Sequence, residues 1–223
     1  MNRSSWLVEI RRETEEQYDI VWSPFYGEKW GLYDNSVHQQ FIAKLLALLP
    51  EHSHVLDAAC GAGRYMPFLL EKGHTVLGID QSQGMLSRAK LYFPTVHTEK
   101  VGLQEISYDQ LFDGAICMDA MENVSPEDWP LVLGNFHRAL KPQGYLYFTA
   151  EVADESDVQK AFIAGQQLGL PVVYGESGEW ADENVYHYWP SMPQVREWLA
   201  QAGFDVLEEG EEGWYHHFLT REV

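Results

Sequence analysis

Between His54 and Glu151, short apolar segments alternate with segments of helical spacing, and this alternation constrains the fold more than any other feature of the chain. The predicted strands are residues 54–59, 74–80, 94–101, 111–119 and 144–151, and the predicted helices among them are residues 64–73, 82–93 and 125–140. Strands that alternate with helices form βαβ units, in which the strands are parallel and the crossovers right-handed. The sequence therefore predicts an α/β fold, doubly wound around a mostly parallel sheet.

The flanking segments extend this prediction. Residues 14–21 and 35–49 are predicted to be helical, with a loop after Pro24. Residues 152–189 are irregular apart from a helix predicted at 158–168, and a helix over 192–203 precedes two strands within residues 204–220. Two strands this close form a hairpin, so one of them runs antiparallel to the rest of the sheet.

Composition excludes several classes of partner. The chain has 223 residues and a formal net charge of −19, which argues against a nucleic-acid backbone or an anionic membrane surface as the main partner. No apolar run is long enough to span a bilayer, and the first residues have no apolar signal core, so a cytoplasmic location is expected. With only Cys60 and Cys117, no disulfide framework is expected, and both are read as packed thiols.

The stretch "VLDAACGAGRYMPFLL", residues 55–70, places a glycine loop between the first strand and a helix. A triphosphate-binding loop would end in Gly-Lys-Ser or Gly-Lys-Thr, whereas Gly63 is followed by Arg64. A dinucleotide-binding loop has a third glycine, where this chain has Met66, and Asp57 would face the pyrophosphate at close range. The triphosphate interpretation fails, and the dinucleotide interpretation is weakened but stays open.

A third interpretation is a nucleoside that has no phosphates and carries positive charge. Asp57, at the end of the first strand, could accept from an ammonium or orient the loop. Asp80 ends the second strand, where one carboxylate can accept from both ribose hydroxyls.

At these positions the sequence resembles class I S-adenosylmethionine-dependent methyltransferases. The resemblance is carried by "VLDAACGAGRYMPFLLEKGHTVLGIDQSQGMLSRA", "LFDGAICMDAMENV" and "FHRALKPQGYLYFT", and it covers about residues 55–150 with a similar tail from Met192. It implies a Rossmann-like, seven-stranded sheet of order 3-2-1-4-5-7-6 whose last strand is antiparallel. It also implies S-adenosylmethionine as cofactor and S-adenosylhomocysteine as product.

We expect one domain over residues 1–223. Its parts are an N-terminal helical cap (1–52), a cofactor-binding half (53–151), an insert that forms the acceptor pocket (152–192), and a C-terminal helix and hairpin (193–223).

The resemblance also implies residue roles. The loop backbone from Asp57 to Gly63 would line the methionine part of the cofactor, with Asp57 near its ammonium, and Asp80 would bind the ribose. The other cofactor residues it implies are Ala58, Ala59, Gly61, Arg64, Gln81, Met85, Leu103, Gln104, Met118 and Asp119. Arg64 could reach the cofactor carboxylate or face solvent, and the family more often has Asp where this chain has Gln104. The aromatic N-terminal stretch with Tyr18, Trp22, Tyr26, Trp30 and Tyr33 is expected over the cofactor, with Tyr18 and Tyr26 in contact.

Methyl transfer needs alignment and exclusion of water more than any one catalytic side chain. Glu122 and His187 are the candidate catalytic residues. Some relatives that methylate quinone-type hydroxyls have Glu-His where this chain has Glu122-Asn123, which puts a quinol substrate in doubt. Aromatic residues of the insert predict a partly apolar pocket for a small organic acceptor: Tyr174, Trp180, Tyr186, Tyr188 and Trp189. No metal is indicated, because no His, Cys or acid cluster has ligand spacing. The alternative functions are a nicotinamide-dependent oxidoreductase and a catalytically inactive S-adenosylmethionine-binding protein.

Overall fold

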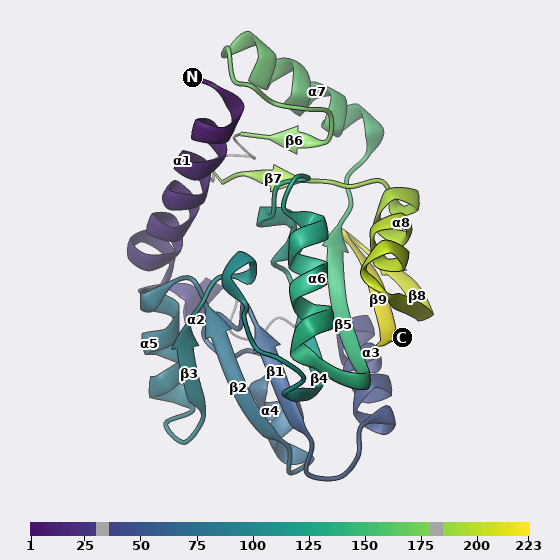
Figure 1. The fold of residues 1–223 in the computed structure, drawn as a ribbon. Helices are drawn as coiled ribbons and strands as arrows, with labels where there is room; N and C mark the ends of the chain where they lie inside the picture. The colour runs from purple at the N-terminus through teal and green to yellow at the C-terminus, as the bar shows by residue number, and fades with distance from the viewer. Residues whose placement is uncertain (30–35, 179–184) are drawn as a thin grey trace.

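The computed structural model describes residues 1–29, 36–178 and 185–223, and it contains the predicted parallel sheet. The strands of this sheet are β1 (His54–Ala58), β2 (Thr75–Asp80), β3 (His97–Lys100), β4 (Phe112–Cys117), β5 (Leu140–Glu151), β8 (Phe204–Glu212) and β9 (Tyr215–Glu222). Their order is β3-β2-β1-β4-β5-β9-β8, and β9 pairs antiparallel with β5 (Figure 1). The predicted order 3-2-1-4-5-7-6 and the antiparallel last strand are confirmed.

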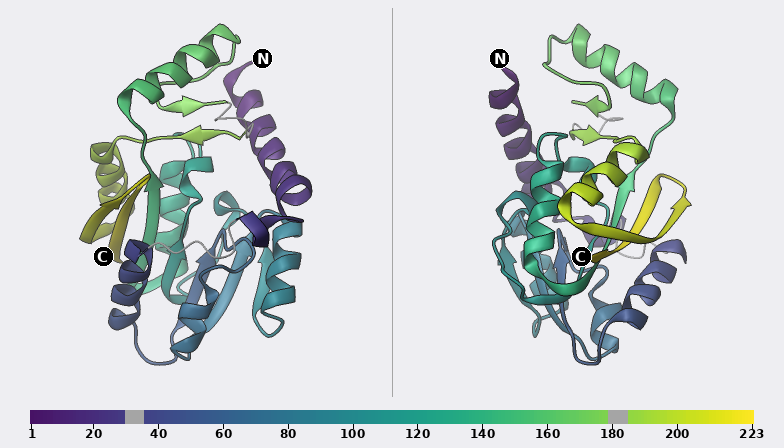
Figure 2. Two further views of the ribbon diagram at one scale, coloured as in Figure 1. Left: turned by 180° about the vertical axis from the view of Figure 1, so that it is seen from behind. Right: turned by 45° about the vertical axis from the view of Figure 1, so that its right-hand side comes forward.

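Helices cover both faces of the sheet (Figure 2). One face packs on α3 (Ser36–Leu48), α4 (Met66–Glu71) and α5 (Gln83–Tyr92), and the other on α6 (Trp129–Ala139) and α8 (Met192–Ala202). Neighbouring strand residues alternate between the two cores: Val55 and Ile116 face the first group of helices, and Leu56 and Ala115 the second. This alternation arises because successive side chains of a strand point to opposite faces, and burial on both explains the continuous apolar strands.

The N-terminal segment is more helical than the sequence indicated. The predicted helix over 14–21 is replaced by α1 (Arg3–Glu16) and the π-helical η1 (Gln17–Trp22), and α2 (Tyr26–Lys29) follows. Asp19 of η1 accepts hydrogen bonds from the Ser82 hydroxyl (2.6 Å) and the Gly84 N–H (2.8 Å), which fixes η1 at the start of α5. A Cβ on Gly84 would lie 2.6 Å from the Asp19 carbonyl oxygen, so this close approach requires glycine. Trp30 and Tyr33 lie outside the described residues.

The insert after β5 contains α7 (Glu155–Gln167) and a two-stranded sheet of β6 (Glu176–Ser177) and β7 (His187–Tyr188). Figure 1 shows α1, β6, β7 and α7 beyond the end of the sheet toward which β5 runs. Arg3 of α1 ties these parts together, because it donates to the fully buried carboxylate of Glu176 (2.7 Å) and also pairs with Glu127 before α6. The helix predicted over 158–168 corresponds to α7, which begins at Glu155.

Several predicted boundaries were wrong by a few residues. The helix expected to be capped by Ser125 begins at Trp129, because residues 126–128 form a turn after which the N–H groups of Asp128 and Trp129 donate to the Ser125 carbonyl. The helix after the glycine loop begins at Met66 rather than Arg64, and the fifth strand begins at Leu140 rather than Gly144. The helix predicted to end at Gly203 does so, whereas the helix predicted to run to Gly73 ends at Glu71; both glycines adopt positive φ. No described helix combines the length and apolar character needed to cross a membrane.

Candidate active site

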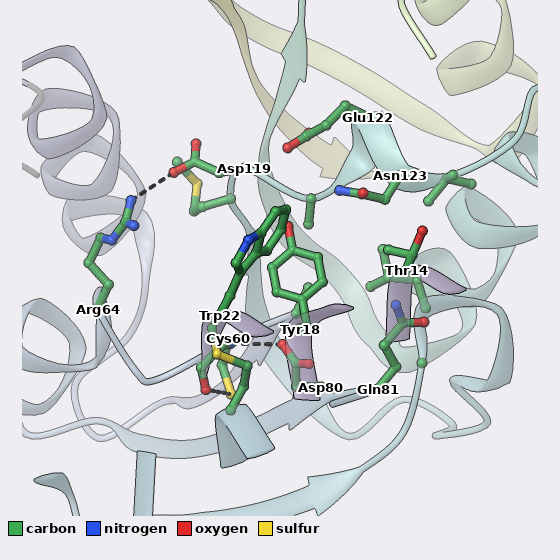
Figure 3. Close-up of a pocket in the computed structure, with 18 of the residues that line it drawn as sticks. Thr14, Tyr18, Trp22, Cys60, Arg64, Asp80, Gln81, Asp119, Glu122 and Asn123 are labelled. Carbon is green, nitrogen blue, oxygen red and sulfur yellow. Dashed lines mark hydrogen bonds and ion pairs between the residues drawn. The ribbon is translucent and has the colours of Figure 1, made fainter. Parts of the chain in front are cut away.

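A cavity of about 340 Å³ lies at the carboxyl edge of the sheet, where β1, β2, β4 and β5 end, and the N-terminal helices close its other side (Figure 3). Figure 3 shows Asp80 and Gln81 at one end, Asp119, Glu122 and Asn123 at the other, with Tyr18 between them. The predicted site residues that line it are Tyr18, Tyr26, Ala59, Gly61, Arg64, Asp80, Gln81, Met85, Leu103, Gln104, Met118, Asp119, Glu122 and His187. The predicted residues Asp57, Ala58 and Gly63 do not line it.

Asp80 anchors the nucleoside end of the cavity. Its Oδ2 accepts from the N–H of Gly61 and its Oδ1 from the N–H of Ser82, both at 2.8 Å. Burial raises the pKa of Asp80 to about 6, although both hydrogen bonds oppose that shift. At neutral pH the carboxylate is therefore ionised, and it couples the glycine loop to the end of β2.

The two glycines of the loop differ in role. Gly61 lines the cavity with φ +53°, and a Cβ there would lie 3.2 Å from Met85 Cε. Glycine therefore leaves space in the cavity beside Met85. Gly63 adopts φ +86°, and a Cβ there would meet the Met66 sulfur and the Phe93 ring at 2.8 Å. Gly63 therefore allows the turn into α4 and is a structural requirement rather than a cavity residue.

Asp57 lies beneath the loop, only 2% exposed, and among the described residues its Oδ2 has no hydrogen-bond donor. Burial, with the charge of Asp80, raises the pKa of Asp57 to about 8. Its predicted place beside an ammonium stays a prediction, since the side chain does not line the cavity.

Asp119, two residues after the end of β4, is the centre of a polar network. Its carboxylate accepts from the Tyr65 hydroxyl (2.9 Å), pairs with Arg64 (3.2 Å) and lies 3.0 Å from His38 Nε2. Burial alone would raise the pKa of Asp119, but the hydrogen bond and charge of His38, with Arg64, outweigh it and lower the pKa. Arg64 thus faces the cavity rather than solvent. Asp119 also adopts φ +52°, a strained conformation for a residue other than glycine, of a kind that is frequent at functional sites.

Two carboxyl groups and one imidazole come together at the end of β5. Glu122 is 5% exposed, and no described donor lies within hydrogen-bond reach of its Oε2. Glu151 ends β5, and its Oε2 lies 3.7 Å from His187 Nε2. Burial raises the pKa of Glu151 to about 7, and burial with the charge of Glu151 raises the pKa of Glu122 well above its usual range. The two candidate catalytic residues predicted from the sequence are therefore brought together, with Glu151 as a third member.

The aromatic wall of the cavity includes N-terminal residues that were expected over the cofactor, but none of the described aromatic residues of the insert. Tyr18, Trp22, Tyr26, Tyr65 and Tyr215 line the cavity. The insert aromatics of the prediction do not: the described ones are Tyr174, which is exposed, and Tyr186, Tyr188 and Trp189, which are buried outside the cavity lining. Tyr186 packs edge-on against Trp6 of α1, which explains its burial, and Trp180 lies outside the described residues.

Sequence reasoning missed other lining residues, among them Arg11, Thr14, Tyr65, Asn123, Glu151 and Tyr215. The position of Glu151 could have indicated a site residue, because it ends a parallel strand as Asp80 does. No sequence pattern indicated Arg11 or Thr14, since they belong to a polar helix without a motif. Cys60 and Cys117 are buried free thiols, as predicted, and burial raises the pKa of both. Among the described residues, no three His, Cys, Asp or Glu side chains are grouped to hold a metal ion.

Comparisons with known proteins agree with this geometry. Residues 55–144 match a methyltransferase domain family. The chain is 32% identical over 123 residues to YqeM of Bacillus subtilis (strain 168), covering 52% of this chain and 50% of that one. It is 29% identical over 147 residues to the malonyl-[acyl-carrier protein] O-methyltransferase of Pectobacterium atrosepticum, covering 59% and 53%. The chain thus spans about half the length of the curated relatives it matches.

The fold is shared with a solved structure, the 1,6-didemethyltoxoflavin-N1-methyltransferase of Burkholderia thailandensis with bound 1,6-didemethyltoxoflavin and S-adenosylhomocysteine. The TM-score is 0.70 at 18% identity, over 100% of this chain and 91% of that one. The family match lies on the strands and loop that form the floor of the cavity, and the strand order is the one that the resemblance implied. Residues 55–144 of the chain are thus similar to a methyltransferase domain, and the whole chain shares the fold of a methyltransferase solved with S-adenosylhomocysteine.

Proposed function

We propose that the protein transfers a methyl group from S-adenosylmethionine to a small organic acceptor. The observation that carries this proposal is one cavity with two chemically distinct ends. Asp80, Gln81 and the glycine loop lie at one end, and Glu122 lies at the other, near Glu151 with its neighbour His187. The first end offers a carboxylate for ribose hydroxyls, and the second offers groups that can hold an acceptor and remove its proton.

The residues at the first end fit the cofactor. Asp80 would hold the ribose, Gln81 and Met85 the adenine, and the loop with Arg64 the methionine part. Tyr18 and Tyr26 line the cavity, and the face of an aromatic ring attracts cations. When bound, the cofactor supplies a methyl group on a sulfonium, and the sulfur keeps the electron pair of the bond that breaks.

The remaining work belongs to the protein's own residues. The cavity is lined by side chains of α1 (Arg11 and Thr14) and of η1 (Tyr18 and Trp22), so these segments can exclude water and fix the direction of approach. Glu122, Glu151 or His187 can accept a proton from the acceptor. A nicotinamide-dependent reaction is less favoured, because Asp57 lies beneath the loop that would hold the pyrophosphate and Met66 stands where that loop needs glycine.

The test is transfer of label from methyl-labelled S-adenosylmethionine to a panel of small amines, phenols, carboxylic acids and thiols. The proposal predicts label in an organic product and release of S-adenosylhomocysteine. His187→Ala should lower kcat while the affinity for S-adenosylhomocysteine stays unchanged, with His97→Ala, an exposed histidine, as the matched control. A protein that binds S-adenosylhomocysteine but labels nothing in the panel would favour the catalytically inactive alternative.

A further inference from the structure

The acceptor end of the cavity carries buried acid groups that the described cations do not neutralise. The described positive side chains of the lining are Arg11 and Arg64. Arg11 pairs with Glu105 and Arg64 with Asp119, so both have acid partners already. Glu122 and Glu151 have no described arginine or lysine partner among the ion pairs of the structure, and His187, 3.7 Å from Glu151, is the one basic group beside them.

Glu122 is also aimed at the cavity. It is 5% exposed, it lines the cavity, and its Oε2 has no described hydrogen-bond donor. Figure 3 shows its carboxylate directed into the space beside Asp119. A backbone N–H favours the charged form of Glu122 and the Trp189 side chain that of Glu151, but neither donor carries a counter-charge. Two buried carboxylates that repel each other are costly unless a proton or a cation lies between them. The shifted pKa values of both groups reflect that cost.

Two tyrosines complete this end of the cavity. Tyr18 and Tyr215 both line it, and each is close enough to Glu122 that the carboxylate charge adds to the effect of burial in raising the tyrosine pKa. Aromatic faces beside carboxylates form a favourable site for a desolvated cation, since both the ring quadrupole and the acids attract positive charge.

We propose that the methyl acceptor is a small basic amine, which enters as an ammonium ion and is held between Glu122 and Glu151. This inference rests on the proposed function and specifies its substrate class. An ammonium nitrogen has no lone pair, so one proton must first move from nitrogen to a carboxylate oxygen of Glu122 or Glu151. The neutral amine then uses its lone pair for the new nitrogen–carbon bond, and the methylated nitrogen takes over the positive charge that the sulfonium loses.

A neutral hydroxyl acceptor explains this arrangement less well. It needs one base and leaves the second buried carboxylate without a counter-charge, whereas an ammonium ion offers three N–H donors and a full charge. An acidic acceptor is disfavoured more strongly, because like charges in a buried site repel.

The experiment measures the affinity of matched amines and alcohols for the protein saturated with S-adenosylhomocysteine, by calorimetry. The pairs are phenethylamine and phenethyl alcohol, tryptamine and tryptophol, and hexylamine and hexanol. The variants are Glu122→Gln, Glu151→Gln and the double variant, with Glu71→Gln, an exposed glutamate of α4, as the control. At least one amine should bind the wild type about tenfold or more tightly than its alcohol, a preference that Glu122→Gln and Glu151→Gln should each reduce and Glu71→Gln should keep.

The failures are distinguishable. If S-adenosylhomocysteine does not bind, the proposed function itself fails. If it binds, the amine inference is overturned by any of three results: no amine of the panel binds, the alcohols bind as tightly as the amines, or the amine preference survives in the double variant. If Glu122→Gln weakens S-adenosylhomocysteine and leaves the amines unchanged, the carboxylate serves the cofactor ammonium and the inference is likewise overturned.

Discussion

Replacement of Asp80 by asparagine should separate the nucleoside end of the site from the rest of the fold. Each oxygen of this carboxylate accepts one backbone N–H, from Gly61 or Ser82, at 2.8 Å, and each retains lone pairs that can accept from a ribose hydroxyl. Asparagine has the same size but only one acceptor oxygen, so it loses one backbone bond and one ribose bond.

The expected loss follows from the charge of the acceptor. A hydrogen bond to a charged group contributes roughly 1.5–3 kcal/mol, so loss of one from the complex should raise the Kd for S-adenosylhomocysteine by about 10-fold to 100-fold. Calorimetry above neutral pH is the assay, because the pKa of Asp80 near 6 then keeps the wild-type carboxylate ionised. Wild-type affinity should also fall as the pH drops through about 6, and this dependence should be weaker in the variant.

A fragment comparison distinguishes ribose binding from support of the loop. Wild type should bind adenosine more tightly than dideoxyadenosine, which lacks both ribose hydroxyls, and Asp80→Asn should bind the two nearly alike. Asp109→Asn, at an exposed aspartate outside the cavity lining, should retain the discrimination. If the folded Asp80→Asn variant still discriminates between the fragments, Asp80 supports only the loop and the ribose assignment is refuted.

Three further predictions concern stability and are checked by urea unfolding. Gly63→Ala should lower the free energy of unfolding by roughly 1–3 kcal/mol, because of the positive φ and the clash at 2.8 Å, whereas Gly134→Ala, in open space on α6, should be neutral or stabilising; equal effects would contradict the account. Asp57→Asn should flatten the dependence of the free energy of unfolding on pH. In the wild type the folded pKa of Asp57, near 8, lies above the unfolded value, so between these two values the folded state binds the extra proton. The free energy of unfolding of the wild type should therefore fall by up to about 1.4 kcal/mol per pH unit from about pH 5 to about pH 8. A pH profile identical in the variant would refute this. Arg3→Met should lower the free energy of unfolding by roughly 2–3 kcal/mol. This is less than the loss expected for a fully buried ion pair, because Glu176 still accepts from the Val173 N–H and the Tyr186 hydroxyl. A change below about 0.5 kcal/mol would show that the Arg3–Glu176 pair does not hold α1 in place.

The floor of the site was predictable because it follows from strand geometry. In a parallel sheet the residues that end neighbouring strands meet at one edge, so the position of Asp80 and the resemblance at Asp119 indicated one common site. The same rule would have indicated Glu151, which ends β5, but that residue was read only as the end of a strand.

The cover of the site was less predictable. Helix α1 is mostly polar and has few buried residues, so its pattern does not reveal that Arg11 and Thr14 reach the cavity. Its position is set by distant partners such as Glu176, which no local pattern reports. The aromatic residues of the insert were predicted to form the acceptor wall. Tyr186 instead packs against Trp6 of α1, because tertiary packing between distant segments decides which aromatic side chains remain at a cavity.

The central claim is that the cavity at the carboxyl edge of the sheet holds a nucleoside without phosphates, and it is tested most directly by calorimetric titration with S-adenosylhomocysteine, using NADH as the control. The account predicts micromolar or tighter binding of S-adenosylhomocysteine and no binding of NADH. Binding of NADH without binding of S-adenosylhomocysteine would contradict it, and would mean that the glycine loop before α4 holds a pyrophosphate despite Asp57 and Met66.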